Sequence, residues 1–315
     1  RFNDVSYTYP ETGIQALSNL SFTLQPGTTI AITGRTGSGK STVAQLCMRL
    51  MDPTTGSISF GGIDIKDQPL SQYKNRTGYV PQDVFLFSDT IENNISFGST
   101  EKVNQSEIES AAKQSAVHND IIGLENGYQT ILGERGVNLS GGQKQRISIA
   151  RALLRKPDLL ILDDCLSAVD TNTEKHIINS LEKLHDINPS TATIMVSHRI
   201  STIKHADHII VIDEGKVIDQ GSHKELVNAG GLYSDMNEQQ LTEAQKHEDR
   251  FMACVSPIFL ERYQAAQPVL DRSMAHCWAL GLHLRRLTAE ARAEMHRWPG
   301  PHSPREKWMR DQVGV

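Results

Sequence analysis

Short apolar runs alternate with amphipathic stretches along most of the chain, which predicts strands covered by helices. Residues 28–33 form a β-prone run, and residues 43–50 after it have apolar positions at helical spacing. Residues 158–163 predict a strand with a continuous apolar run, which is typical of burial on both faces of a parallel sheet. A further strand is expected over residues 193–197, and a helix over residues 171–185. This alternation indicates an α/β fold with a parallel core.

Antiparallel pieces and a polar helical region interrupt this pattern. Residues 2–25 predict two strands joined by a turn, and residues 57–65 predict a hairpin around two glycines. Residues 90–127 are polar and helical in spacing. Ser106 is the expected N-cap of their clearest helix, with Glu109 three positions later.

The character of the sequence changes after about residue 245. All three tryptophans lie in residues 246–315, where 11 Lys/Arg against 8 Asp/Glu give a net charge of +3, compared with −8 for the remainder. This C-terminal extension predicts an amphipathic helix at about 271–297, followed by disorder. Its composition favours a fusion remnant, or sequence unrelated to the natural end of the preceding domain, over a genuine extension, and we assign it no chemistry.

Composition narrows the classes of function. The net charge of −5 gives no bulk electrostatic argument for nucleic-acid binding. No apolar run approaches the roughly 20 residues of a membrane helix, and no signal peptide opens the chain. The four cysteines lack metal-ligand spacing and are expected to be free thiols in a reducing compartment. The start at Arg1, at the edge of a strand-like segment, predicts a fragment of a longer protein.

A glycine-rich loop, residues 34–42, joins the strand at 28–33 to the helix at 43–50. It has the G-x-x-x-x-G-K-S pattern of a phosphate loop, in which backbone N–H groups point into one concavity at the positive end of a helix. Lys40 is expected to reach the β- and γ-phosphates, and Ser41 to ligate Mg²⁺. The residues expected to bind the nucleotide here are Gly34, Arg35, Thr36, Gly37, Ser38, Gly39, Lys40, Ser41 and Thr42.

A carboxylate ends the apolar strand at residues 158–163. An apolar strand that delivers an acidic side chain beside a phosphate loop predicts a partner for Mg²⁺. Asp163 is therefore the expected magnesium residue, directly or through water.

A third motif identifies the family. Residues 139–143 read Leu-Ser-Gly-Gly-Gln, at the end of an expected loop at 136–143 and before an expected helix at 144–155. With the two phosphate-site motifs in this order, residues 1–240 resemble the ATP-binding cassettes of the ABC superfamily. The resemblance implies a P-loop NTPase fold with a RecA-like parallel core, an antiparallel β subdomain and a helical subdomain at about 85–155. It also implies that Ser140, Gly141, Gly142 and Gln143 contact the ATP held by a second cassette, so that two cassettes enclose two ATPs head to tail.

The resemblance assigns further residues around the ATP. Tyr9 is similar in position to the aromatic residue that stacks on adenine. Gln82 corresponds to the glutamine that reaches Mg²⁺ and senses the membrane domain. His198, at a strand end, corresponds to the switch histidine at the γ-phosphate.

Two segments resemble the exporter branch of the superfamily, namely residues 85–91 and residues 133–136. The loop at 167–170 resembles the one that crosses the dimer interface, with Val169 where Leu is usual. The implied function is ATP-driven export of a drug, lipid or peptide by cassettes joined to transmembrane domains. Those domains are absent from this chain, and the implied location is the cytoplasmic face of the plasma membrane.

Asp164 departs from the family pattern, which has Glu there as the general base for the attacking water. The Asp side chain is shorter by roughly 1.5 Å, and a misplacement of that order can cost ~10²-fold in rate. Cys165 and Leu166 also replace the usual Ala-Thr. The pattern resembles the poorly hydrolysing half of heterodimeric multidrug exporters. A homodimeric cassette that still hydrolyses remains the alternative.

Two other classes are weighed against an exporter. A soluble ABC-type ATPase of the DNA-repair kind needs a long coiled coil between Lys40 and Leu139, and the roughly 100 residues there leave no room for one. Translation-type members carry two cassettes, and one is visible here. A non-catalytic regulatory module is compatible with Asp164, whereas His198 and the intact phosphate loop favour nucleotide turnover.

Overall fold

A computed structural model describes residues 1–99, 102–133, 139–187, 190–243 and 245–246. The contacts within the chain divide it into Arg1–Thr242 and Glu243–Val315. The elements below belong to the first unit, except that the last residue of the helix at 232–243 is the first residue of the second unit. The helix expected at about 271–297 and the disorder expected beyond it lie outside the described residues, as do residues 134–136 of the second exporter-like segment.

A six-stranded sheet forms the centre of the first unit, with strand order β10-β9-β3-β8-β7-β6. The strands β9, β3, β8, β7 and β6 run parallel, and β10 pairs antiparallel with β9. All five residues of β7 and of β8 are buried, as the continuous apolar runs require. The expected parallel core is confirmed. The strands are β3 (Thr29–Gly34), β6 (Thr77–Val80), β7 (Leu159–Asp163), β8 (Ala192–Val196), β9 (His208–Asp213) and β10 (Lys216–Gly221).

The strand register places several chain segments at one edge of this sheet. Val196, the last residue of β8, lies opposite Ile32 of β3 on one side and Asp163 of β7 on the other. Because these strands are parallel, the phosphate loop and the residues after Asp163 and Val196 leave the sheet at the same edge. Such an edge is where open α/β sheets bind their ligands.

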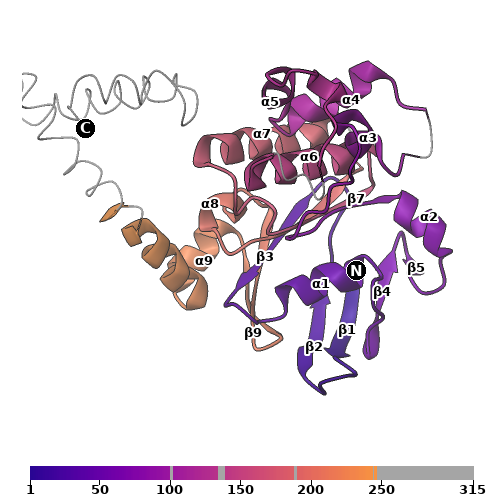
Figure 1. Cartoon of the computed structure of the whole chain (residues 1–315). Coiled ribbons are helices and arrows are strands. Elements are labelled where there is room, and N and C mark those ends of the chain that lie inside the picture. Colours follow the sequence, from indigo (N-terminus) through magenta and orange to yellow (C-terminus); the bar gives the residue numbers. More distant parts are fainter. Residues whose placement is uncertain (100–101, 134–138, 188–189, 244, 247–315) are drawn as a thin grey trace, which may run out of the picture. The chain divides into compact units, whose positions relative to one another are not determined.

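The predicted antiparallel sheet is also present, with strand order β2-β1-β4-β5. Figure 1 shows helix α1 beside these strands. Val43 and Leu46 of α1 belong to one hydrophobic cluster with Leu20 of this sheet and Ile32 of the parallel sheet. The helix therefore joins the two sheets through a common core. The elements are β1 (Phe2–Thr8), β2 (Gln15–Phe22), β4 (Thr55–Phe60), β5 (Ile63–Asp64) and α1 (Lys40–Cys47).

The region around residues 85–155 holds helices with a hydrophobic cluster of their own. Helix α6 contributes Ile147 and Leu154 to that cluster, and Ile149 and Leu153 to the cluster on the parallel sheet. This helix therefore connects the helical region to the sheet (Figure 1). The elements are α3 (Ile91–Ser96), α4 (Gln105–Gln114), α5 (His118–Ile122), the 3₁₀ turn η1 (Gly127–Gln129) and α6 (Gly141–Leu154).

Two helix starts differ from the sequence prediction. Asn104, not Ser106, caps α4, because its Oδ1 accepts from the Glu107 N–H at 3.0 Å and Glu107 bonds back to the Asn104 N–H. The Ser106 hydroxyl donates to the same Asn104 oxygen. Helix α6 begins at Gly141, three residues before the expected 144–155 helix.

The remaining helices complete the cluster on the parallel sheet or flank the antiparallel one. Residues 232–243 are also helical, and Tyr233 in that helix is fully buried. Of the cysteines that the structure describes, Cys47 and Cys165 are free and buried. The remaining helices are α2 (Leu70–Asn75), α7 (Thr171–Ile187), α8 (Ile200–Ile203) and α9 (His223–Ala229).

Candidate functional site

The phosphate loop depends on two glycines for steric reasons. Gly34 has a φ of +143°, and a Cβ there would lie 1.9 Å from the carbonyl oxygen of Ile212. Gly39 has a φ of +101°, and its Cβ would lie 2.5 Å from the carbonyl oxygen of Ala16. At Gly37 (φ +80°) a Cβ would meet nothing within 4 Å, so glycine is favoured there by backbone conformation alone.

The Lys40 side chain bends back onto the phosphate loop to which it belongs. Its ammonium donates to the carbonyl oxygens of Gly34 at 2.9 Å and Arg35 at 2.6 Å. Burial lowers the pKa of Lys40, while the charges of Asp164 and Asp163 favour its protonated form. A cation held among carbonyls at a helix N-terminus can exchange those contacts for phosphate oxygens.

The expected magnesium residues meet directly. The Ser41 hydroxyl donates to Asp163 Oδ1 at 3.1 Å, and the Tyr79 hydroxyl donates to Oδ2 at 3.3 Å. Burial raises the pKa of Asp163, which is 3% exposed, and these two hydrogen bonds oppose the shift. The described residues hold no group of three or more His, Cys, Asp or Glu that could bind a metal. A hydroxyl beside one carboxylate fits Mg²⁺, which commonly completes its shell with phosphate oxygens and water.

Asp164 and His198 form a pair at the same edge of the sheet. Asp164 has a φ of +46°, and its N–H donates to the carbonyl oxygen of Val196 at 2.8 Å. This backbone turn brings its carboxylate to the residues after β8. Nδ1 of His198 lies 3.1 Å from each Asp164 oxygen, and the Ser197 hydroxyl donates to Oδ1 at 3.4 Å.

These segments line a common cleft of about 660 Å³. Tyr9 enters it with its hydroxyl 3.1 Å from Thr42 Oγ1 and its ring edge-on to Tyr7. The ring is thus fixed beside the start of α1. Residues from the phosphate loop, Gln82, Asp164 and His198 also line the cleft. The structure thus brings together expected site residues from five separate parts of the sequence.

The β9–β10 hairpin supports the loop, which the sequence did not indicate. The Gly215 N–H donates to the carbonyl oxygen of Ser38 at 3.2 Å, and the Gly215 carbonyl accepts from Ser18 N–H at 2.8 Å. Arg35 pairs with Asp213 at 3.4 Å, but its side chain is 69% exposed, so that ion pair contributes little.

The signature motif, residues 139–143, lies elsewhere. Among the described residues that line the cleft, none comes from this motif. Ser140 caps α6: its hydroxyl accepts from the Gln143 N–H at 3.2 Å, and Gln143 Oε1 accepts from the Ser140 N–H at 3.0 Å. Gln143 Nε2 in turn donates to Asp120 Oδ1 at 3.1 Å, and Arg146 pairs with Asp120 Oδ2 at 2.9 Å. Asp120, which no motif in the sequence indicates, therefore supports the helix start that the motif forms.

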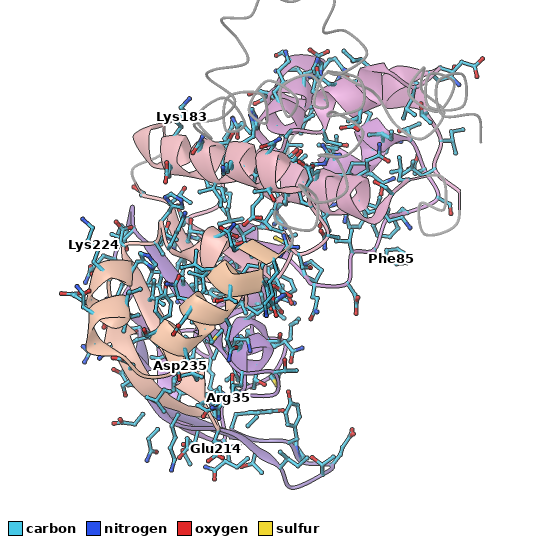
Figure 2. All side chains as sticks on the ribbon, turned by 90° about the vertical axis from the view of Figure 1, so that its left-hand side faces the viewer. Arg35, Phe85, Lys183, Glu214, Lys224 and Asp235 are labelled. Carbon is cyan, nitrogen blue, oxygen red and sulfur yellow. The ribbon has the colours of Figure 1, made fainter. Side chains whose placement is uncertain are left out.

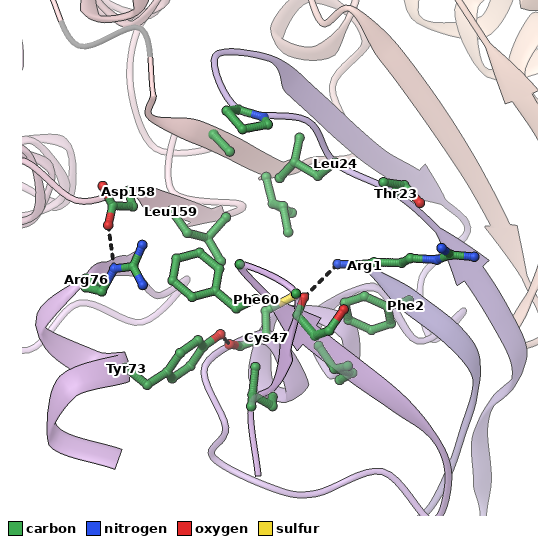
Figure 3. Close-up of a pocket in the computed structure, with 18 of the residues that line it drawn as sticks. Arg1, Phe2, Thr23, Leu24, Cys47, Phe60, Tyr73, Arg76, Asp158 and Leu159 are labelled. Carbon is green, nitrogen blue, oxygen red and sulfur yellow. Dashed lines mark hydrogen bonds and ion pairs between the residues drawn. The ribbon is translucent and has the colours of Figure 1, made fainter. Parts of the chain in front are cut away.

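A second cavity, of about 640 Å³, lies beside the antiparallel sheet. Figure 3 shows the largely apolar side chains around it and the Arg76–Asp158 ion pair, whose atoms are 2.6 Å apart. Among the described residues that line this cavity, none is an expected site residue. The expected chemistry therefore belongs to the 660 Å³ cleft.

Comparisons with known proteins agree with this geometry. Residues 17–167 match a family model described as ABC transporter. The chain is 46% identical over 239 residues to an uncharacterized ABC transporter ATP-binding protein, YfiB, of Bacillus subtilis (strain 168). The matched region covers 76% of this chain and 41% of that protein. It is 45% identical over 240 residues to the ATP-dependent lipid A-core flippase of Pasteurella multocida (strain Pm70), with the same coverage.

A solved structure is similar as well. It is a bacterial Atm1-family ABC exporter with ATP bound, with a TM-score of 0.71 and 40% identity over 76% of this chain and 41% of that chain. The present chain thus spans about two fifths of the length of these relatives. In the part of the chain that the structure describes, no helix combines the length and apolar character needed to cross a bilayer. The first unit of this chain is therefore an ATPase domain of the ABC type.

Proposed function

We propose that this domain is the motor of an ABC exporter, in which ATP-driven pairing of two cassettes drives export of a drug, lipid or peptide through transmembrane domains. The observation that carries the nucleotide part is the direct contact between Ser41 and Asp163, at the mouth of a sterically required glycine loop. The named exporters among the relatives support the transport part. The domain would then lie at the cytoplasmic face of the plasma membrane.

The chain's own side chains bind and orient ATP. Tyr9 offers its ring to the adenine, and Lys40 exchanges its loop carbonyls for phosphate oxygens. Ser41, Asp163 and Gln82 would hold Mg²⁺, which when bound supplies positive charge to the phosphates. His198, which lines the cleft, would contact the γ-phosphate.

A second cassette is part of the proposal because no described residue of the signature motif lines this chain's own cleft. The capping box of Ser140 and Gln143 pre-forms a helix start with free N–H groups, which favours the phosphates of ATP held by another chain. Gly141 and Gly142 keep that helix start open to close approach. A Cβ at Gly142 would lie 3.0 Å from the carbonyl oxygen of Ala168, so the motif is also packed on the loop at 167–170.

We further propose that this chain's own site hydrolyses ATP slowly. The Asp164 carboxylate is bound by His198 on both oxygens, and it is shorter by one methylene than the usual base. Because such a base activates water poorly, ATP would stay bound and would hold the two cassettes together. Ser140 and its neighbours would meanwhile complete a hydrolysing site on a different partner cassette. A homodimer with ordinary turnover is the competing arrangement.

An exposed aromatic cluster, formed by Phe85, Phe87 and Phe97, is the surface that we assign to the transmembrane domains. Phe85 and Phe97 are each 52% exposed, and the Phe87 ring lies 5.1 Å from Phe85 and 4.2 Å from Phe97. Figure 2 shows Phe85 projecting from the ribbon. Arg151 donates to the Phe85 carbonyl at 3.1 Å and lies 5.8 Å from the centre of the Phe87 ring. These two contacts hold the aromatic cluster against helix α6.

The test compares the native chain with Asp164→Glu. MgATP binding and MgATP turnover are measured for each, together with the oligomeric state in the presence of ATP. Binding by both, with turnover at least tenfold faster in Asp164→Glu, supports the slow-site proposal. Equal turnover would favour the homodimer, and absence of MgATP binding in both would contradict the motor function itself.

A further inference from the structure

Gln240 bridges both sides of the turn that follows His198. Its Nε2 donates to the His198 carbonyl oxygen at 2.7 Å, and its Oε1 accepts from the Ile200 N–H at 2.8 Å. The residue lies 42 positions after His198, in the helix at 232–243. One amide side chain therefore holds the carbonyl and the N–H that flank a single residue, Arg199.

The turn needs this support because its own helix is uncapped. Helix α8 begins at Ile200, and its N-cap residue, Arg199, makes no side-chain capping bond. The first N–H groups of a helix have no partner within the helix. The Arg199 guanidinium instead donates to the carbonyl oxygen of Ser167 at 2.8 Å and to Glu174 at 3.3 Å. Gln240 thus supplies, from a distant helix, an acceptor for the first of these N–H groups, that of Ile200.

The helix that carries Gln240 is itself anchored. Tyr233 is fully buried, and its hydroxyl lies 2.7 Å from Nδ1 of His223. Met236 packs on the hydrophobic cluster of the parallel sheet. Gln240 therefore projects from a fixed support toward the turn.

We propose that Gln240 is a positioning residue for His198. By fixing the backbone on both sides of Arg199, it sets where the His198 imidazole stands relative to Asp164 and the cleft. The inference rests on the proposed ATPase function, and it assigns a role in the site to the helix at 232–243, which contributes no residue to the cleft lining.

The experiment uses two substitutions of Gln240 and a matched control. Gln240→Ala removes both bonds. Gln240→Glu keeps the acceptor for the Ile200 N–H but places an oxygen against the His198 carbonyl. Gln239→Ala is the control, because Gln239 is the exposed neighbour in the same helix. Each is made in the native chain and in Asp164→Glu, with MgATP turnover, MgATP affinity, melting temperature and amide hydrogen exchange as readouts.

We expect Gln240→Ala to lower kcat about tenfold, with KM and MgATP affinity within twofold of the parent. Exchange at the Ile200 amide should accelerate in Gln240→Ala but stay slow in Gln240→Glu, while kcat falls in both. In a His198→Ala background, Gln240→Ala should lower turnover no further, because it acts through the histidine. The control should match the parent in every readout.

Unchanged exchange at Ile200 in Gln240→Ala would overturn the inference, as would a fall in kcat shared equally by Gln239→Ala. An additive loss in the His198→Ala background would also overturn it. If no variant binds MgATP, the motor function fails instead, and hydrogen exchange still decides whether Gln240 holds the turn.

Discussion

Nδ1 of His198 lies 3.1 Å from both carboxylate oxygens of Asp164. The histidine side chain is 54% exposed and the aspartate side chain 14%, so the pair joins a solvent-facing imidazole to a shielded carboxylate. The Asp164 backbone is fixed separately, by its N–H bond to Val196. The imidazole is therefore the movable member of the pair.

This relationship predicts that removing the imidazole changes turnover more than binding. His198→Ala in the Asp164→Glu chain should lower kcat by about 10- to 100-fold, because the imidazole that we propose to contact the γ-phosphate is lost. MgATP affinity should change by less than about threefold, since Lys40 and Ser41 remain. Steady-state turnover and nucleotide titration measure the two quantities. His205→Ala, at a half-exposed histidine outside the cleft lining, is the control, and an equal effect there would refute the assignment.

The glycines of the phosphate loop predict a contrast in stability. Gly37→Ala introduces a Cβ with open space around it, so its cost is the left-handed backbone alone, about 1–2 kcal/mol. Gly39→Ala adds a clash at 2.5 Å with the Ala16 carbonyl and should cost about 3 kcal/mol or more. Denaturant unfolding of the two variants measures the difference. Equal losses of unfolding free energy in the two variants would contradict this prediction, because they would mean that the backbone near Gly39 moves to accommodate the Cβ at no energetic cost.

The burial of Asp163 predicts that replacing it will raise the free energy of unfolding, even though the replacement damages the proposed magnesium site. Because burial raises the pKa of Asp163, the folded state keeps its proton to higher pH than the unfolded state does. The cost of the buried charge is therefore complete above the raised pKa. It disappears as the pH falls from that pKa to the ordinary aspartate value of about 3.8. Asp163→Asn should unfold at a higher denaturant midpoint than the native chain at pH 7. The difference between the two midpoints should shrink as the pH falls from the raised pKa of Asp163 to the ordinary aspartate value.

The same variant should lose magnesium-dependent nucleotide binding. Ser41→Ala is the informative comparison, because it removes the hydroxyl while leaving the buried carboxylate in place. It should weaken magnesium-dependent binding without the stability gain. A midpoint for Asp163→Asn below that of the native chain at every pH would contradict the assigned cost of burial.

Site residues whose signals are local could be predicted from the sequence. The phosphate loop, the apolar strand ending at Asp163, and the residues of the signature motif follow from patterns within about ten residues. Tyr79 was missed because its bond to Asp163 depends on the pairing of Tyr79 with Ile161 between β6 and β7. Gln240 was missed because its partners lie about forty residues earlier in the chain.

The misplaced cap of α4 has a local cause. Ser106 and Asn104 both precede a glutamate by three residues, so the capping pattern fitted two alternative starts. Helix α4 begins at Gln105, which gives Asn104 the extended backbone of a cap and places Ser106 inside the first turn. Both boxes precede a helix that buries Ile108, Ala111 and Ala112, so the capping pattern alone did not choose between them.

The contact between Gln143 and Asp120 predicts an effect on the partner's ATP rather than on the chain's own. Gln143 uses its carbonyl to bind Ser140 and its amide to bind Asp120, so the carboxylate fixes which way the amide faces. Asp120→Ala frees the amide and, among the residues that the structure describes, leaves Arg146 with two backbone partners, Ala116 at 2.6 Å and Gly142 at 3.3 Å. The helix start that would contact the partner's phosphates is then less well fixed.

In ATP-dependent pairing of Asp164→Glu chains, Asp120→Ala should reduce turnover about tenfold while MgATP binding by each monomer stays within twofold. Asp120→Asn keeps an acceptor for Gln143 and should recover most of the loss. Glu109→Ala, at a half-exposed acid on the neighbouring helix α4, is the control. Since monomer binding and paired turnover are measured on the same chains, a loss confined to monomer binding would place the action of Asp120 in its own cleft and refute the assignment to the partner's.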